Sequence, residues 1–89
     1  MNLSKYDRGI ETRVRKFNGE YYLIGKGKVY SLNYLGAVVL KYIGSDITVN
    51  ELSNKISEKY PGTDIETISK DVITFLDFLC NEKLIKLTA

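Results

Sequence analysis

Hydrophobic and polar residues alternate along the first third of the chain, as they do in a β-strand that is half buried in a sheet. The alternation begins at Ile10, and it returns in segment 28–33, where Tyr30 and Leu32 fall on one face. Between these two stretches, residues 20–24 are almost continuously apolar or aromatic, as expected of a central strand. The pattern therefore predicts three strands, and the third runs directly into a helix.

Two short turns separate the predicted strands. Asn18-Gly19 suits a type I′ hairpin turn, because both positions of that turn need positive φ angles. Segment 25–27, with a glycine at each end, supplies the second turn. The three strands thus form an antiparallel meander, in which the first and third strands each keep one free edge. Residues 1–9 show no periodicity, and we expect them to form a loose entry segment.

Apolar residues then recur at spacings of three and four, which predicts helices. Asn33 is placed to cap the first helix, and Gly44 is placed to end it in a left-handed conformation. The segments Thr48–Glu51 and Thr63–Glu66 both read as capping boxes, which predict the starts of the second and third helices. Pro61 stops the second helix before the third begins.

The third predicted helix, from about residue 64 to residue 81, has an apolar arc wider than one packing face needs. At 100° per residue, its buried stripe consists of Ile65, Ile68, Val72, Leu76 and Leu79. A second group lies on the flank of that stripe and consists of Asp71, Thr74, Phe75, Phe78 and Glu82. Leu84, Ile85 and Leu87 are expected to close the domain as a short extended tail. The predicted fold class is α+β, a three-stranded antiparallel meander followed by three helices.

Composition narrows the possible functions. The 89 residues fit one domain, 1–89, with a modest core. The chain has one cysteine, Cys80, and no histidine, so we expect no disulfide, no metal site, no cofactor and no paired nucleophile and base. No signal peptide or membrane-spanning stretch is recognisable, and a reducing, cytoplasmic setting is expected. We therefore predict that the chain is not an enzyme.

Several motifs occur in a familiar order. A glycine turn precedes Val29-Tyr-Ser-Leu-Asn33, and a helix containing Gly36-Ala-Val-Val-Leu40 follows. Ile43-Gly-Ser-Asp-Ile-Thr48 comes next, and Asp71-Val-Ile-Thr-Phe-Leu-Asp-Phe-Leu79 and Lys83-Leu-Ile85 complete the series. In this order and spacing, the chain resembles the PqqD-like family over about residues 10–87. Members of that family are small winged helix-turn-helix domains that act as precursor recognition elements for ribosomally synthesised, post-translationally modified peptides (RiPPs), so the resemblance implies that fold for this chain.

The resemblance implies a non-catalytic protein that holds the leader of a precursor peptide for modifying enzymes. The leader would add as an antiparallel strand to the third strand and lie in the groove between that strand and the third helix. The protein would be similar to the stand-alone members that serve lasso-peptide leader peptidases, cyclases or radical SAM enzymes. The expected peptide-binding residues are Lys28, Val29, Tyr30, Ser31, Leu32, Asp71, Thr74, Phe75, Phe78 and Glu82. Val29 and Ser31, or Tyr30, are expected to wall the side-chain pocket on the strand side.

Some of these assignments have alternatives. Phe75 and Phe78 could belong to the core, Asp71 could be a solvated surface charge, and the basic residues of the first strand could be a solvated face or a docking patch. A DNA-binding winged helix has the same architecture, but residues 64–83 contain five acidic and two basic side chains, which repel phosphate. A weak homodimer through the third strand is a further possibility, because a free edge can pair with its own copy.

Overall fold

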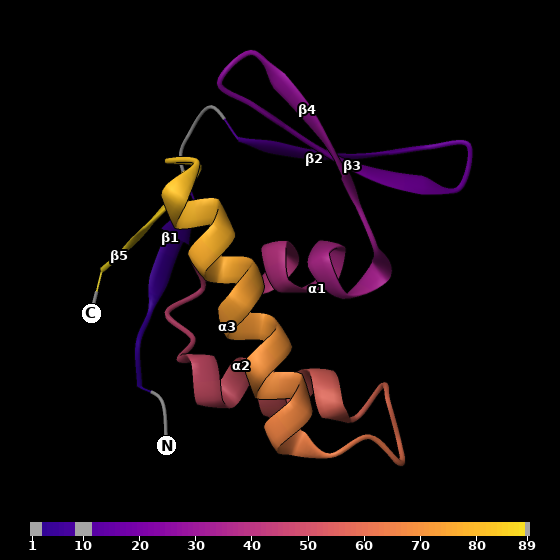
Figure 1. The fold of residues 1–89 in the computed structure, drawn as a ribbon, viewed down its shortest axis with the longest axis vertical. Helices are drawn as coiled ribbons and strands as arrows, with labels where there is room; N and C mark the ends of the chain where they lie inside the picture. Colours follow the sequence, from indigo (N-terminus) through magenta and orange to yellow (C-terminus); the bar gives the residue numbers. More distant parts are fainter. Residues whose placement is uncertain (1–2, 9–11, 89) are drawn as a thin grey trace.

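The computed structural model describes residues 3–8 and 12–88 (Figure 1). In chain order, the elements are β1 (Tyr6–Arg8), β2 (Arg13–Phe17), β3 (Glu20–Gly25), β4 (Lys28–Leu32), α1 (Tyr34–Tyr42), α2 (Val49–Ser57), α3 (Ile65–Asn81) and β5 (Ile85–Leu87). A sheet with the order β2-β3-β4 lies over the helices, and β1 and β5 form a separate two-stranded ribbon beside α3 (Figure 1). The predicted α+β fold, a three-stranded meander followed by three helices, is confirmed.

The meander has the predicted antiparallel register. Phe17 pairs with Glu20 across the Asn18-Gly19 turn, and both turn residues have positive φ, at 51° and 80°. The second turn also has two central residues, Lys26 and Gly27, with φ of 55° and 72°. These left-handed angles match the right-handed twist of the strands, which explains why both connections are so short.

One face of the sheet packs on the helices and the other is open to solvent. Leu23, which is fully buried, pairs across the sheet with the half-buried Val14 and Tyr30. The residues next to them along the strands point to the opposite face, and Ile24 and Val29 are exposed there. The sheet is therefore half buried, as the alternation predicted.

The first two helices begin as predicted, and α1 also ends as predicted, but α2 ends at Ser57, before Pro61. The Asn33 side chain accepts a hydrogen bond from the Gly36 N–H, and Gly44 follows α1 with φ of 90°. Thr48 caps α2 in a complete capping box with Glu51, whose carboxylate accepts from the Thr48 N–H. Both helices have only nine residues, so packing on the core must hold them in place.

The capping box predicted at Thr63–Glu66 is wrong. Asp64 is the N-cap residue of α3, and its side chain makes no capping hydrogen bond. Ile65 is also not part of the buried stripe, because it lies in the first turn and is 38% exposed. The rest of that stripe is buried as predicted, and consists of Ile68, Val72, Leu76 and Leu79. The core of the domain forms where this stripe meets α1, α2 and Leu23.

The expectation of a loose entry segment at residues 1–9 is wrong for Tyr6–Arg8, which form β1. This strand pairs antiparallel with β5, and Tyr6 lies opposite Leu87. The extended tail was predicted, and Leu84 and Ile85 are buried, but Leu87 is 57% exposed. The predicted first strand was expected to start at Ile10, which lies outside the described residues. No helix in the described part of the chain is long and apolar enough to cross a membrane.

Candidate functional site

The outer edge of β4 carries backbone groups that the sheet leaves unpaired. Within the described residues, β4 pairs with β3 alone, and a two-residue turn closes this hairpin at the pair Gly25 and Lys28. Such a closing pair is hydrogen-bonded, and bonded and non-bonded pairs then alternate along an antiparallel ladder. Tyr30 and Leu32 therefore bond to β3, whereas the N–H and C=O groups of Val29 and Ser31 point outward. This edge offers two donors and two acceptors to an added strand.

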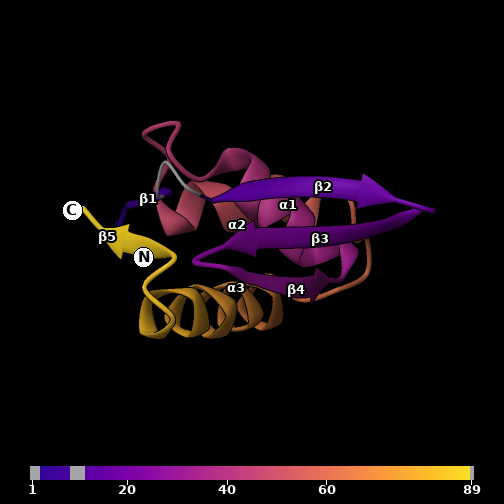
Figure 2. The same ribbon diagram turned by 90° about the horizontal axis from the view of Figure 1, so that it is seen from above.

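The tail of the protein does not cover this edge. β5 pairs with β1, and Figure 2 shows β5 past the C-terminal end of α3 and not alongside β4. Seen from above, α3 runs alongside β4 just beyond the edge of the sheet (Figure 2). A strand that paired with β4 would lie between β4 and α3, in the position that the sequence analysis expected.

A groove lies between α1 and α3 at the end of this edge. Its volume is about 340 Å³. Four of the predicted site residues line the groove from α3: Asp71, Thr74, Phe75 and Phe78. Phe78 is 45% exposed, whereas Phe75 is half buried and packs against the core. The structure thus places the predicted acidic and aromatic flank of α3 in one groove.

Three further residues line the groove from the start of α1, and the site list from the sequence did not contain them: Asn33, Leu35 and Gly36. A Cβ atom at Gly36 would lie 3.1 Å from Phe75 Cζ and 3.3 Å from Asn33 Oδ1. The absence of a side chain therefore lets the Phe75 ring lie against α1. The signal in the sequence was a glycine inside a helical pattern, which often marks a close approach.

Tyr30 and Glu82 join β4 to the last turn of α3. The Tyr30 hydroxyl donates a 2.8 Å hydrogen bond to Glu82 Oε1, and Lys28 Nζ lies 3.9 Å from the same oxygen. The Tyr30 ring also meets Phe78 edge to face, with ring centroids 5.9 Å apart. The hydrogen bond to Glu82 raises the pKa of Tyr30, with partial desolvation as a smaller cause. These contacts fix the distance between the strand edge and the helix at one end of the groove.

The side chains of Val29 and Ser31 do not wall this groove, contrary to one of the two expectations. They point to the open face of the sheet, where Val29 is 67% exposed, and Ser31 lines a separate hollow beside Tyr21 and Tyr34. The Tyr30 ring instead contacts Phe78 of α3, and Leu32 is half buried against the core. Val29 and Ser31 therefore present their backbone to an added strand, not their side chains.

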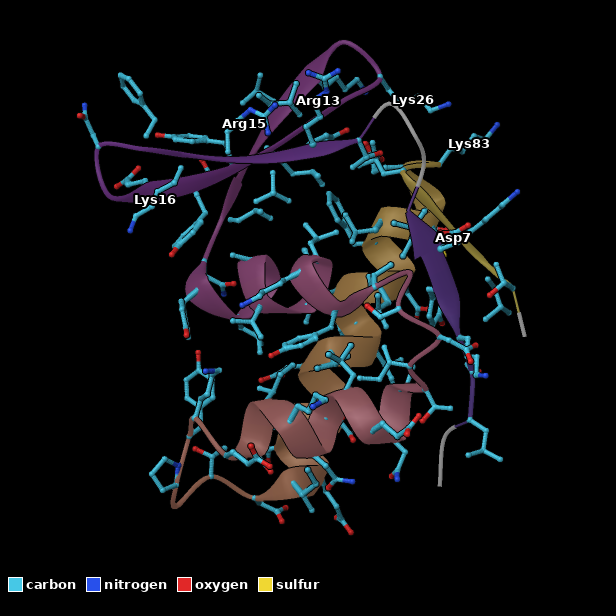
Figure 3. All side chains as sticks on the ribbon, turned by 180° about the vertical axis from the view of Figure 1, so that it is seen from behind. Asp7, Arg13, Arg15, Lys16, Lys26 and Lys83 are labelled. Atoms are coloured by element: carbon cyan, nitrogen blue, oxygen red, sulfur yellow. The ribbon has the colours of Figure 1, made fainter. Side chains whose placement is uncertain are left out.

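The other free edge of the sheet, on β2, differs in chemistry. The Arg15 guanidinium donates a 3.1 Å hydrogen bond to the Val14 carbonyl oxygen, one of the groups that the alternation leaves outward on β2. Figure 3 shows Arg13 and Arg15 on the outer side of the sheet and Lys16 on the side facing the helices. Charged side chains of this kind protect a strand edge from further pairing. The β4 edge is therefore the better acceptor for a peptide strand.

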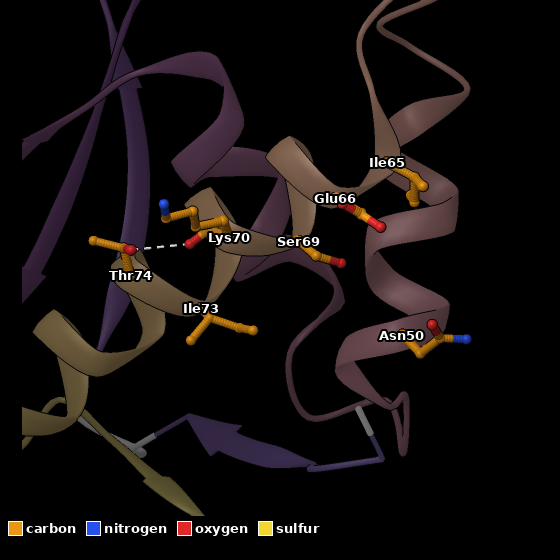
Figure 4. Close-up of a pocket in the computed structure, with 7 residues that line it drawn as sticks. All are labelled: Asn50, Ile65, Glu66, Ser69, Lys70, Ile73 and Thr74. Atoms are coloured by element: carbon orange, nitrogen blue, oxygen red, sulfur yellow. Dashed lines mark hydrogen bonds between the residues drawn. The ribbon is translucent and has the colours of Figure 1, made fainter. Parts of the chain in front are cut away.

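A second hollow, of about 560 Å³, lies between the beginnings of α2 and α3 (Figure 4). Only helical residues line it, among them Asn50, Ile65 and Ile73. The Thr74 hydroxyl at its margin donates to the Lys70 carbonyl oxygen of its own helix, at 2.9 Å. The backbone groups of helices are already paired within each helix, so this hollow cannot extend a sheet. It is a weaker candidate than the β4 edge.

The surroundings of Cys80 disfavour the thiolate form of its side chain. It is half buried beside the core, and partial burial, with the Asp77 charge as a smaller cause, raises the pKa of its thiol. A raised pKa lowers the fraction of thiolate, the nucleophilic form. Cys80 is also not among the residues that line the groove.

Comparisons with known proteins agree with this geometry. A chain solved as "TbiB1 in Complex with the TbiA(beta) Leader Peptide" superposes with a TM-score of 0.76 at 20% identity, over 90% of this chain and 94% of that chain. The PqqD truncation of Methylobacterium extorquens PqqCD, described as a functional, stand-alone RiPP recognition element, superposes with a TM-score of 0.79 at 18% identity, over 91% of this chain and 87% of that chain. At these identities, the likeness shows a shared fold. No curated protein sequence matches the chain. The family model for coenzyme PQQ synthesis protein D (PqqD) matches residues 9–85, and the chain therefore belongs to the PqqD family.

Proposed function

We propose that this protein is a leader-peptide-binding protein of a RiPP pathway, which captures a precursor peptide and presents it to modifying enzymes. The leader adds to β4 as an antiparallel strand, and its side chains on the inner face enter the groove between α1 and α3. The observation that carries this proposal is the outward backbone of Val29 and Ser31 next to an aromatic groove. Family membership and the solved leader complex of a similar fold support it.

In this proposal, backbone pairing and side-chain burial have different roles in peptide binding. An open strand edge binds extended peptides with little regard to sequence, and the adjoining pocket supplies the selectivity. One aliphatic side chain buried in the groove contributes roughly 1.5–3 kcal/mol, while ordering a flexible leader costs about 2–5 kcal/mol. One or two anchors together with the backbone bonds are therefore needed for stable capture.

The protein itself performs no chemistry in this proposal. It acts as one domain, and the enzyme that it serves is a leader peptidase, a cyclase or a radical SAM enzyme. DNA binding gains no support from the geometry, because the exposed face of α3 carries the acids Asp71 and Asp77. A helix with this charge opposes a phosphate backbone.

The proposal can be tested with a displayed library of random peptides about twenty residues long, which is enough for a strand as long as β4 and a flanking segment. We expect selection against the immobilised protein to yield binders, and calorimetry then measures the affinity of one selected peptide. Ser31→Pro removes an outward N–H group, and proline is tolerated at such edge positions. Ser31→Ala is the matched control, because it keeps that N–H group and loses only the hydroxyl.

We expect Ser31→Pro to weaken binding by about tenfold, the cost of one lost hydrogen bond to the peptide, and Ser31→Ala to have little effect. Equal affinities for the two variants would exclude strand addition at β4. A library that yields no binder would exclude capture of extended peptides altogether.

A further inference from the structure

A third hollow, on the other side of α1 from the groove, combines aromatic rings with unpaired positive charge. Its volume is about 180 Å³. Its lining residues are Tyr21, Tyr34, Ala37, Val38, Lys41, Tyr42 and Lys59. The rings of Tyr21 and Tyr34 are tilted against each other, with their centroids 6.5 Å apart. We call this hollow the tyrosine pocket.

Lysines surround the tyrosine pocket. Lys16 Nζ lies 5.5 Å from the centre of the Tyr21 ring, and the Nζ atoms of Lys41 and Lys55 lie 5.7 and 5.6 Å from the centre of the Tyr42 ring. Within the described part of the chain, the lysines at positions 16, 41, 55 and 59 make no salt bridge. Among the residues that the structure describes, no carboxylate lines the pocket. The pocket therefore has the charge and the apolar surface that an acidic peptide segment with an aromatic or aliphatic residue would complement.

Shared lining residues connect the tyrosine pocket to the groove. Asn33 lines the groove and also the hollow at the end of β4 that Ser31 lines, which we call the intermediate hollow. Tyr21 and Tyr34 line both this intermediate hollow and the tyrosine pocket. The groove, the intermediate hollow and the tyrosine pocket are therefore neighbours in sequence around the start of α1. The carboxylate of Glu20 lines the intermediate hollow and accepts a hydrogen bond from the Tyr22 hydroxyl at 3.1 Å.

The direction of the added strand decides which part of a peptide lies beside these hollows. β4 runs from Lys28 to Leu32, so the N-terminal end of an antiparallel partner lies beside Leu32. The residues that precede the paired strand in the peptide thus emerge at Asn33, which lines the groove and the intermediate hollow. The residues that follow the strand leave at the opposite end, beside Lys28.

We propose that the tyrosine pocket binds an acidic segment of the precursor peptide, which lies immediately N-terminal to the strand held at β4. This inference rests on the proposed function and adds a second, charge-selective contact to it. The leader then spans two sites of different chemistry, and the four lysines select leaders with Asp or Glu on the N-terminal side of the strand. A second contact on the same peptide raises the affinity because it binds at a high effective concentration.

The random-peptide library described above tests this inference. We expect the peptides selected by the wild type to be enriched in Asp and Glu only on the N-terminal side of their groove-binding stretch. Selection with the Lys41→Gln/Lys59→Gln variant should lose this enrichment and keep the groove-binding stretch. The matched control, Lys26→Gln/Lys86→Gln, removes the same charge at exposed positions away from the pocket and should keep both features.

Direct titration of one selected acidic peptide then measures the effect. We expect the Lys41→Gln/Lys59→Gln variant to bind it roughly fivefold more weakly at low salt, as two partly screened charge contacts predict. The control pair should bind like the wild type, and high salt should remove the difference. In NMR spectra, the peptide should shift the amide signals of Tyr34 and Ala37.

The outcomes separate the two proposals. Groove-dependent binders without acidic enrichment, or equal effects of the two lysine pairs, would overturn this inference and leave the proposed function intact. Tyr34 and Ala37 shifts caused by short oligothymidylate, and not by the acidic peptide, would assign the pocket to nucleic acid and also overturn it. Selected peptides whose affinity is unchanged by Ser31→Pro would contradict strand addition at β4. They would also contradict this inference, which depends on strand addition.

Discussion

Phe78→Ala tests whether the flank of α3 serves the groove or the core. Phe78 is 45% exposed, so little more than half of its surface is buried in the free protein. Complete burial would give a cost of about 3–5 kcal/mol for Phe→Ala, part of it from the cavity left behind. The groove is open to solvent, so no closed cavity forms, and we expect the loss of stability to be about 1.5–2 kcal/mol. For a domain of this size, Tm should fall by about 10 °C.

Phe78→Ala should reduce the affinity for the peptide by a larger fraction than it reduces the stability of the fold. The Phe78 side chain lines the groove and holds the Tyr30 ring edge to face, so its removal takes away one wall of the anchor site. Loss of an apolar contact worth roughly 1.5–3 kcal/mol predicts affinity about 10- to 100-fold weaker. Calorimetry with a library-selected peptide, at a temperature at which the variant is fully folded, measures this change.

Leu76→Ala is the matched control on the same helix. Leu76 is fully buried in the core, so its truncation should lower the free energy of unfolding by about 2–5 kcal/mol. It does not line the groove, and the folded variant should bind the peptide with nearly wild-type affinity. If Phe78→Ala destabilises the fold more than Leu76→Ala and leaves the affinity unchanged, Phe78 is a core residue and the assignment of the groove is wrong.

Three further predictions concern the helix start at α2 and the contact that holds the groove. Thr48→Ala removes a capping box and should cost about 1 kcal/mol in chemical denaturation, whereas Thr63→Ala, at a box that does not form, should cost almost nothing; equal losses would contradict this difference. Hydrogen bonds from the Thr48 backbone and hydroxyl hold the pKa of Glu51 below its usual 4.5. The ionised Glu51 side chain therefore stabilises the fold fully above pH 4.5, and this stabilisation disappears as the pH falls through the lowered pKa of the folded state. Thermal melts in acid should show this loss in the wild type and not in Glu51→Gln. Tyr30→Phe keeps the ring contact with Phe78 but loses the bond to Glu82, so it should weaken peptide binding less than Phe78→Ala in the same titration.

Local patterns in the sequence predicted most of the fold. Alternation, the Asn18-Gly19 turn and the capping box at Thr48 each depend on neighbouring residues, and all three are present in the structure. β1 was missed because a three-residue strand has too little alternation to recognise, and its partner β5 lies at the other end of the chain. The box at Thr63 was a false signal, since the same residue types are common at helix starts and do not guarantee the hydrogen bonds.

The candidate site was predictable where it depends on one element and not where it depends on several. Helical periodicity placed Asp71, Phe75 and Phe78 on a common flank, and the structure places all three in the groove. The part played by Gly36 depends on the approach of α3 to α1, which no local pattern contains. The sequence left open whether Val29 and Ser31, or Tyr30, face the helices, because that choice is set by packing at Leu23, on the neighbouring strand.

Amide hydrogen exchange across β4 tests strand addition most directly. In the free protein, the amides of Val29 and Ser31 face outward and should exchange fast, whereas those of Tyr30 and Leu32 bond to β3 and should exchange slowly. At saturation with a library-selected peptide, we predict that the amides of Val29 and Ser31 exchange at least about tenfold more slowly, because they then bond to the added strand. If both amides keep exchanging at their free rates in the saturated complex, the peptide does not pair with β4, and the account of this site is wrong.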